Sequence, residues 1–172
     1  MVLLPAGNPY QKGRLPFASA EHRMNMLSLA FADDAGIEID DRELRRPGPT
    51  YTYDTLVELR AQYGKAESLV WLLGGDAFAR LDTWHRWDEL FALTHFAVID
   101  RPTHQLQIAD TSAALRAELA ARLAGVPETH RAPAGAIVVL GLAPPPVSST
   151  DIRARVHAGQ SIRGLAPDAV CD

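Results

Sequence analysis

The chain has 172 residues, of which 47% are hydrophobic and 22% charged, as in one ordinary globular domain that buries a real core. Its formal net charge of −4 argues against a nucleic-acid partner, because such surfaces depend on clustered Lys and Arg that neutralise phosphates. A small phosphorylated ligand needs only a local basic cluster and stays possible. The single cysteine, Cys171, excludes an internal disulfide and a cysteine zinc site.

The N-terminal segment has a short apolar run before Pro5 and no basic region ahead of it, so it is not a signal peptide. No stretch approaches the roughly 18 consecutive apolar residues of a membrane span. We therefore expect a soluble, cytoplasmic protein with no membrane partner.

Apolar runs of strand length alternate with helical patterns along the chain. Strands are expected at 2–4, 69–75, 95–100 and 136–141, with a weaker one at 37–40, and helices at 19–34, 52–62, 86–93 and 111–124. Runs that are continuous rather than alternating indicate strands buried on both faces. The sequence therefore predicts a doubly wound α/β fold, a parallel sheet with helices on both faces. We expect it to form a single domain over residues 1–172, with surface loops at 101–110 and 125–135.

In such a sheet, ligands bind beyond the carboxyl ends of the strands. The segments that follow the strands are 5–12, 74–76, 100–102 and 143–150. They contain Lys12, Arg101 and a cluster of hydroxyl side chains, so these segments are the candidate site.

The segment 147-VSSTDIRARV-156 follows a predicted strand and a proline run, and it allows two readings of about equal weight. Ser148 or Ser149 and Asp151 suit a plain helix start. A helix that begins at the edge of the sheet is also an anion site, where Arg153 can reach back to a phosphate. Arg155 is expected to point to another face, toward solvent.

Two further segments combine glycine or hydroxyl residues with the start of a helix. Gly74 allows a ligand to approach the backbone, and Asp76 can accept from ribose hydroxyls or cap the next helix. The segment 46-RPGPTYTYDT-55 is a proline-glycine turn followed by Thr50, Tyr51 and Thr52 at the start of a helix. It is either a cap with a packed tyrosine or a pocket for a carboxylate or amide.

The segment 81-LDTWHRW-87 places two tryptophans three residues apart. One is expected in the core and the other as a platform for an aromatic ring, but the pattern does not rank Trp84 and Trp87. The histidines are scattered singly. No nucleophile elbow, Walker-type loop or metal-spaced histidine pair occurs, so a catalytic triad is unsupported.

Taken in order, these segments resemble those of bacterial nicotinate-nucleotide adenylyltransferases over essentially the whole chain. The matching segments are PAGNPYQK, ASAEHRMNML, RELRRPGPTYTYDTL, LLGGDAF, TWHRW, DRP, VSSTDIR and GQSIRGLAPDAV. The resemblance implies the Rossmann-like nucleotidyltransferase fold. It also implies adenylyl transfer from ATP to nicotinate mononucleotide, which gives deamido-NAD and pyrophosphate in NAD biosynthesis. Mg²⁺ would accompany ATP, with no metal ligand from the protein.

The resemblance also assigns roles to single residues. The ATP-phosphate segment would be Ser148, Ser149, Thr150 and Arg153, with Arg153 as its charged member, and the adenosine side would be formed by Gly74 and Asp76. The nicotinate mononucleotide would be bound by Tyr51 and Thr52 at its carboxylate, by Trp84 stacked on its ring, and by His85 and Arg101 along the same pocket.

The loop with Lys12 departs from the family at Gln11, where many members carry a histidine. Gln11 cannot be protonated, so Lys12 would supply the positive charge of this loop. Lys12 and Arg153, from the segment 147–156, would then be the catalytic residues.

The family's N-terminal strand and loop, G-T-F-D-P-x-H-x-G-H, has no counterpart in the sequence. We therefore expect a chain that is incomplete at both ends, with a clipped C-terminal helix. Two alternatives stay open. One is a catalytically impaired remnant that binds the mononucleotide, and the other is a different adenylyltransferase of the same superfamily, such as one acting on phosphopantetheine.

Overall fold

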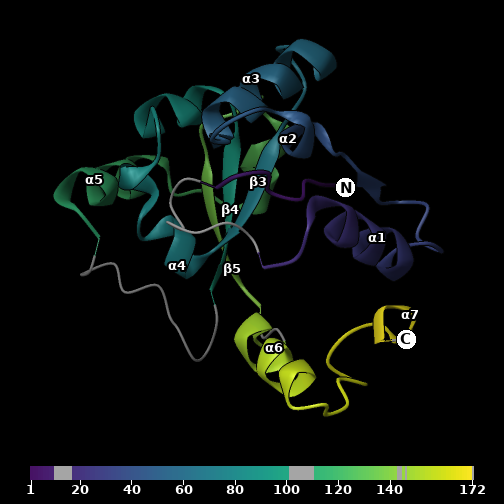
Figure 1. Ribbon diagram of the computed structural model, residues 1–172. Helices are drawn as coiled ribbons and strands as arrows, with labels where there is room; N and C mark the ends of the chain where they lie inside the picture. The colour runs from purple at the N-terminus through teal and green to yellow at the C-terminus, as the bar shows by residue number, and fades with distance from the viewer. Residues whose placement is uncertain (10–16, 101–110, 143–144, 146, 172) are drawn as a thin grey trace. The chain divides into compact units, whose positions relative to one another are not determined.

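The computed structural model describes residues 1–9, 17–100, 111–142, 145 and 147–171 (Figure 1). The chain divides into two compact units. Unit 1 comprises Met1–Thr50 and Pro144–Asp172, and unit 2 comprises Tyr51–Ala143. The single domain expected over residues 1–172 stays a prediction.

Unit 1 consists of a small parallel sheet with short helices. Its elements are β1 (Val2–Leu3), α1 (Ala20–Ala30), β2 (Glu38–Ile39), α2 (Arg42–Arg45), α6 (Ser149–His157) and α7 (Asp168–Cys171). The strands β1 and β2 run parallel, with Val2 opposite Glu38 and Leu3 opposite Ile39. The helix α1 begins at Ser19, whose hydroxyl accepts from the His22 N–H at 3.1 Å. It ends before the Asp34–Gly36 turn, where the Asp34 carboxylate accepts from the Gly36 N–H at 3.0 Å.

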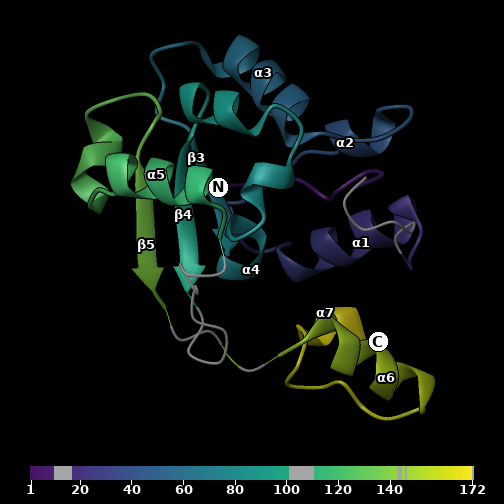
Figure 2. The ribbon, with the colours of Figure 1, turned by 90° about the vertical axis from the view of Figure 1, so that its left-hand side faces the viewer.

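Unit 2 contains a three-stranded parallel sheet in the order β3-β4-β5 (Figure 2). Its elements are α3 (Thr52–Tyr63), β3 (Val70–Gly74), α4 (Gly75–Phe78), η2 (Leu81–Thr83), η3 (Trp87–Ala92), β4 (His95–Asp100), α5 (Ala113–Arg122), η5 (Val126–His130) and β5 (Ile137–Gly141). Parallel strands joined through helices confirm the α/β fold class. The strands form two parallel sheets, one in each unit, where the sequence predicted one.

The core of unit 2 is built around β4, the central strand. In β4, Phe96 and Val98 are fully buried and Ala97 is nearly so, which confirms burial on both faces. The outer strand β3 alternates instead, since Leu73 is buried while Val70 and Leu72 are about half exposed. A strand with a neighbour on one side only is less covered, so the prediction of continuous burial is wrong for β3.

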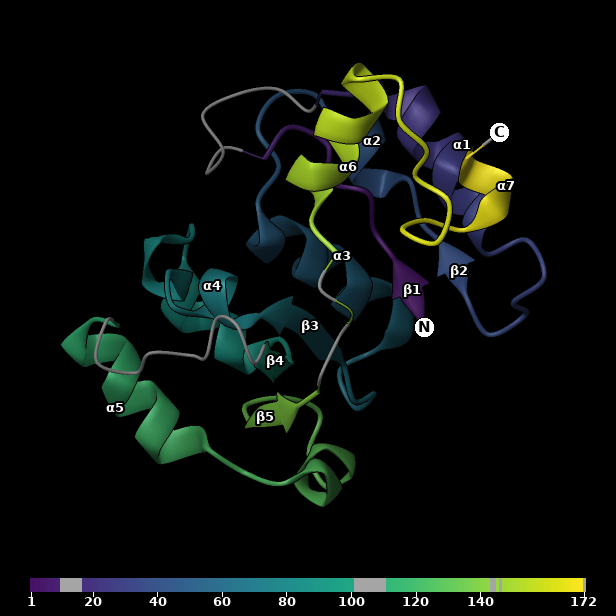
Figure 3. The same ribbon diagram turned by 90° about the horizontal axis from the view of Figure 1, so that it is seen from below.

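One face of this sheet is covered by α5, which lies to one side of the strands in Figure 3. The Phe91 ring meets Phe96 of β4 edge-on, with centroids 5.3 Å apart, and the Arg122 guanidinium lies 4.7 Å from the Phe91 centroid. Leu115 and Leu119 of α5 are buried. These contacts fix the sheet against α5 and η3.

The segment predicted as a helix at 86–93 is a 3₁₀ helix, η3, rather than an α-helix. Its tighter turns are closed by bonds such as Leu93 N–H to Leu90 C=O at 2.9 Å. The segment starts from a sharp turn at Arg86 and stops two residues before β4, which leaves room only for a short helix. No helix in the described part of the chain is long and apolar enough to cross a membrane.

The start of β4 is fixed by His95, which is fully buried. Its Nδ1 accepts from the Ala136 N–H at 2.9 Å, and its Nε2 donates to the Ala132 carbonyl at 2.8 Å in the tautomer that this bond requires. This histidine therefore joins β4 to the segment before β5 and has a structural role.

Candidate functional site

The helix α3 begins without a side-chain cap. Its N-cap residue is Tyr51, in extended conformation (φ −115°, ψ 135°), and the Tyr51 side chain makes no capping hydrogen bond to the helix. By contrast, α1, α5 and α6 are each capped by a serine hydroxyl. The first backbone N–H groups of a helix have no partner within the helix. The start of a helix as long as α3 therefore offers N–H donors to an anion.

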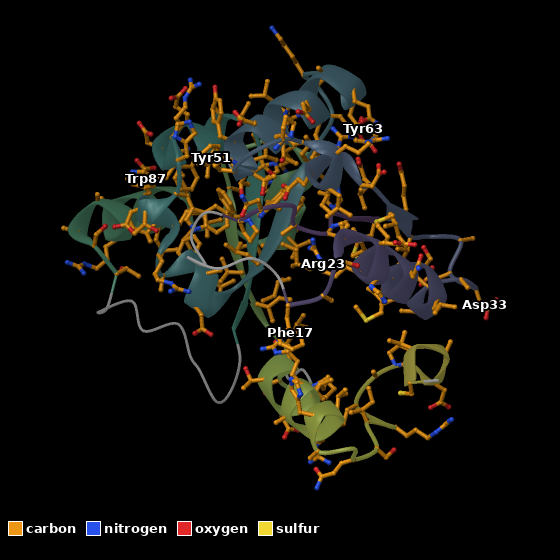
Figure 4. The ribbon with its side chains drawn as sticks, viewed as in Figure 1. Phe17, Arg23, Asp33, Tyr51, Tyr63 and Trp87 are labelled. Atoms are coloured by element: carbon orange, nitrogen blue, oxygen red, sulfur yellow. The ribbon has the colours of Figure 1, made fainter. Side chains whose placement is uncertain are left out.

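Aromatic rings gather at this helix end around Tyr51, which is labelled in Figure 4. The His85 ring is tilted by 41° against the Tyr51 ring, with centroids 4.5 Å apart, and the Tyr53 ring meets His85 edge-on at 6.3 Å. The structure thus brings the rings of Tyr51 and His85 into contact, although the two residues lie more than 30 positions apart in the sequence, and their role in binding the mononucleotide stays a prediction.

The structure distinguishes the two tryptophans that the sequence could not rank. The Trp87 ring meets Phe91 edge-on, with centroids 6.2 Å apart, and so joins the core aromatic cluster. Trp84 is half-buried and makes no such ring contact with the described residues. Of the two side chains, Trp84 is therefore the one left available for a ligand ring.

The end of β3 leads directly into α4 through the two glycines. Gly74 is extended (φ −78°, ψ 157°), and a Cβ placed on it would meet no described heavy atom within 4 Å. Gly75 is buried, and the Asp76 side chain is exposed in the first turn of α4. Packing does not require a glycine at position 74, so the open space beside it is compatible with a ligand.

In unit 1, the start of α6 shows both the cap and the arginine that the sequence indicated. The Ser148 hydroxyl caps the helix by accepting from the Asp151 N–H at 3.0 Å, while Ser149 and Thr150 are exposed. Arg153 reaches back one turn and donates through Nη2 to the Thr150 hydroxyl at 3.2 Å. This bond gathers the guanidinium and the hydroxyl on one side of the helix start.

Arg155 behaves differently from Arg153. Its Nε donates to Asp151 at 3.0 Å in an exposed ion pair. The expected surface position of Arg155 is therefore confirmed, and its charge is already neutralised.

The loop that leads toward Lys12 is anchored by close packing at Gly7. A Cβ on Gly7 would lie 2.1 Å from the Glu43 carbonyl oxygen, so only glycine fits without a shift of the backbone. The Asn8 carbonyl accepts from the Thr50 N–H at 2.9 Å, and the Ala6 carbonyl accepts from Arg23, labelled in Figure 4. Lys12, Gln11 and Arg101 lie outside the described residues.

No group of three His, Cys, Asp or Glu side chains that could hold a metal ion occurs in the described ranges. The expected Mg²⁺ that accompanies ATP stays a prediction.

The sequence analysis did not identify the cluster of Arg86, Glu89 and Tyr53, which lies next to the His85 ring. Arg86 has a left-handed backbone conformation (φ 53°, ψ 42°). Its guanidinium lies 3.8 Å from the Tyr53 ring centroid and donates two hydrogen bonds to Glu89, at 2.6 and 2.5 Å. The spacing of Arg86 and Glu89 allowed an ion pair, but no sequence signal pointed to the backbone conformation.

The Glu89 carboxyl of this cluster is ionised at neutral pH. Hydrogen bonds from Arg86, followed by charge interactions with Arg86 and His85 and a bond from Tyr53, hold the pKa of Glu89 below its ordinary value despite some desolvation. A lowered carboxyl pKa contributes stability above the ordinary pKa, and that stability is lost as the pH falls through the lowered one. The Arg86–Glu89 pair is therefore charged at neutral pH.

A family model described as cytidylyltransferase-like matches residues 1–155. A probable nicotinate-nucleotide adenylyltransferase from Pseudomonas syringae pv. tomato is 40% identical over 168 residues, covering 98% of this chain and 74% of that protein. One from Chromobacterium violaceum is 42% identical over 173 residues, covering 98% and 78%.

Among solved structures, the Plasmodium falciparum nicotinic acid mononucleotide adenylyltransferase complexed with NaAD matches with a TM-score of 0.62 and 15% identity, covering 95% of this chain and 72% of that chain. The same enzyme complexed with APC matches with a TM-score of 0.59 over the same shares. At this identity, the likeness shows the nucleotidyltransferase fold.

Proposed function

Because the chain belongs to the nicotinate-nucleotide adenylyltransferase family, within the cytidylyltransferase-like group, we propose that it transfers the adenylyl group of ATP to nicotinate mononucleotide. The products are deamido-NAD and pyrophosphate. The observation that carries the proposal is the uncapped start of α3 next to the Tyr51–His85 pair, in a chain about 40% identical to enzymes of that name over 98% of its length.

The reaction needs neither a protein nucleophile nor a strong base. The 5′-phosphate oxygen of the mononucleotide is ionised at neutral pH and attacks the α-phosphorus of ATP, and the bond to the pyrophosphate leaving group breaks. The protein's part is in-line positioning and neutralisation of the growing charge on the leaving group. This requirement agrees with the hydroxyls and the guanidinium at the start of α6.

Each group of residues then has a role in this proposal. Ser149, Thr150 and Arg153 hold ATP phosphates, and the open backbone at Gly74 with the Asp76 carboxylate faces the adenosine. Trp84 stacks on the nicotinate ring, with His85 beside it. Lys12 and Arg101 keep the roles that the resemblance implies, as phosphate and pocket residues.

Mg²⁺ is proposed to enter as part of the ATP substrate. The phosphates would carry the ion, and the basic and hydroxyl groups of this chain would bind the phosphate oxygens that remain. The cytoplasm is the proposed location.

The preference for nicotinate over nicotinamide is proposed to lie at the start of α3, where amide donors favour a carboxylate. Thr52→Pro tests this, because proline suits the first helical position and removes one N–H, and Tyr51 before it is already extended. We expect the kcat/KM for nicotinate mononucleotide, divided by that for nicotinamide mononucleotide, to fall about 10-fold. This is the effect of losing one hydrogen bond to a charged group. Equal use of both by the unchanged protein, with the same ratio in the variant, would contradict the idea.

Gly74→Ala tests the ATP side. The added methyl group meets no described protein atom, so the free energy of unfolding should change by less than about 0.5 kcal/mol. The KM for ATP should rise roughly 10-fold, because the methyl group occupies the space where the nucleotide approaches the backbone. Urea unfolding and initial rates give the two numbers. An unchanged KM for ATP would remove Gly74 from the site.

The proposed reaction is tested by incubating the purified chain with ATP, Mg²⁺ and one acceptor, and measuring pyrophosphate and the dinucleotide by chromatography. The acceptors are nicotinate mononucleotide, nicotinamide mononucleotide and 4′-phosphopantetheine. Deamido-NAD as the main product supports the proposal, and adenylylation of phosphopantetheine would assign another activity of the superfamily. Calorimetric binding of the mononucleotide with neither ATP binding nor turnover would identify an impaired remnant.

A further inference from the structure

The turn that carries Trp84 and His85 has an arginine where glycine or asparagine is expected. The Trp87 N–H donates to the Trp84 carbonyl at 3.2 Å and closes a four-residue turn. Arg86 is its third residue, and its positive φ of 53° is unique among the non-glycine residues of the described chain. A residue with a Cβ strains the backbone in that conformation, so something must compensate.

The compensation comes from the Arg86 side chain. Its guanidinium stacks 3.8 Å from the centroid of the Tyr53 ring and forms two parallel bonds with the Glu89 carboxylate. A bidentate pair combined with a ring contact has a defined geometry, unlike an isolated surface ion pair. Tyr53 belongs to the first turn of α3 and Glu89 to η3, so Arg86 links the two helices.

We propose that Tyr53 and Glu89 hold Arg86 in its left-handed conformation, and that this clamp positions Trp84 and His85 against the start of α3 for the ring of the mononucleotide. The clamp is defined as Tyr53, Arg86 and Glu89. The inference rests on the proposed function for its ligand. Arg86 is a positioning residue, because its own charge is satisfied by Glu89 while its neighbour His85 contacts Tyr51.

Arg86→Gly is the decisive variant, because glycine adopts a positive φ without strain but cannot form the clamp. We expect the KM for nicotinate mononucleotide to rise about 10-fold as the turn loses its fixed geometry. The KM for ATP should stay within about 2-fold, since the clamp includes neither Gly74 nor a residue of α6, to which the ATP side is assigned. Arg86→Lys, which keeps the charge but not the paired bonds, should recover part of the loss.

Arg131→Ala is the matched control. Arg131 pairs with Glu128 at the same three-residue spacing, at 3.2 Å, and its side chain is exposed. This variant should leave both KM values unchanged. A normal KM for the mononucleotide in Arg86→Gly, or an equal rise for ATP, would overturn the proposal.

A second readout is independent of turnover. In the free protein, the Tyr51 ring should shift the imidazole proton resonances of His85, which His85→Gln identifies among the six histidines. In Arg86→Gly these resonances should move toward those of an exposed histidine, and in Arg131→Ala they should not. Unmoved resonances would overturn the clamp. An absence of turnover in the unchanged protein would instead overturn the proposed function, and the resonances would still decide the clamp.

Discussion

Replacement of Arg153 by alanine is expected to lower kcat for adenylyl transfer by about 100-fold or more, the range found when one preorganised transition-state donor is removed. The charge on the pyrophosphate leaving group grows as its bond to the α-phosphorus breaks, so a guanidinium there contributes most in the transition state. The KM values should change less than kcat. Rapid-quench or steady-state measurement of deamido-NAD formation gives both quantities.

Arg155→Ala is the control for this prediction. Arg155 belongs to the same helix, but its guanidinium is bound to Asp151 at 3.0 Å instead of the Thr150 hydroxyl. Loss of an exposed ion pair of this kind has a small effect on stability and none on the leaving group. If Arg155→Ala and Arg153→Ala slow the reaction equally, the effect comes from α6 as a whole, and the role of Arg153 is wrong.

The arrangement at α6 confirms the cap reading of this segment, and the phosphate reading stays a prediction. The Ser148 hydroxyl caps the helix, and Arg153 reaches back to Thr150, so cap and basic cluster occur in one helix start. A cap uses one of the first amides and leaves others, so the two readings do not exclude each other. The sequence contained both signals because serine at the cap and arginine one turn later are local features.

Local signals explain which parts of the fold were predictable. The serine cap of α6 and the apolar runs of β3, β4 and β5 depend on neighbours in sequence, and the structure confirms the Ser148 cap and these strands within a few residues. The full burial of His95 was not predictable, because its partners Ala132 and Ala136 lie about 40 residues further along the chain.

The candidate site divides in the same way. Tyr51, Thr52, Gly74 and Asp76 could be placed from turn and strand-end patterns, but the pairing of Tyr51 with His85 needed the resemblance or the structure. The left-handed Arg86 runs against its own backbone preference, so no propensity could reveal it. Such a conflict between a residue and its local conformation is expected near functional residues.

The two tryptophans of TWHRW should respond in opposite ways to replacement by alanine. Trp84→Ala should raise the KM for nicotinate mononucleotide about 10-fold to 100-fold, because stacking of an aromatic ring on a base is worth about 1–3 kcal/mol. The free energy of unfolding should fall by less than about 1 kcal/mol, since the ring is half-buried and makes no ring contact with the described residues.

Trp87→Ala should instead lower the free energy of unfolding by about 2–3 kcal/mol, because its ring packs on Phe91, which packs on Phe96 in the core. Its KM for the mononucleotide should stay near that of the unchanged protein at temperatures where it is folded. Urea unfolding and initial rates on both variants give a two-by-two comparison. If Trp87→Ala raised the KM for the mononucleotide and Trp84→Ala lowered the free energy of unfolding, the two roles would be reversed. Trp87 would then stack on the nicotinate ring, and Trp84 would be the core ring. The turn closed between Trp84 and Trp87 would present its other face to the substrate.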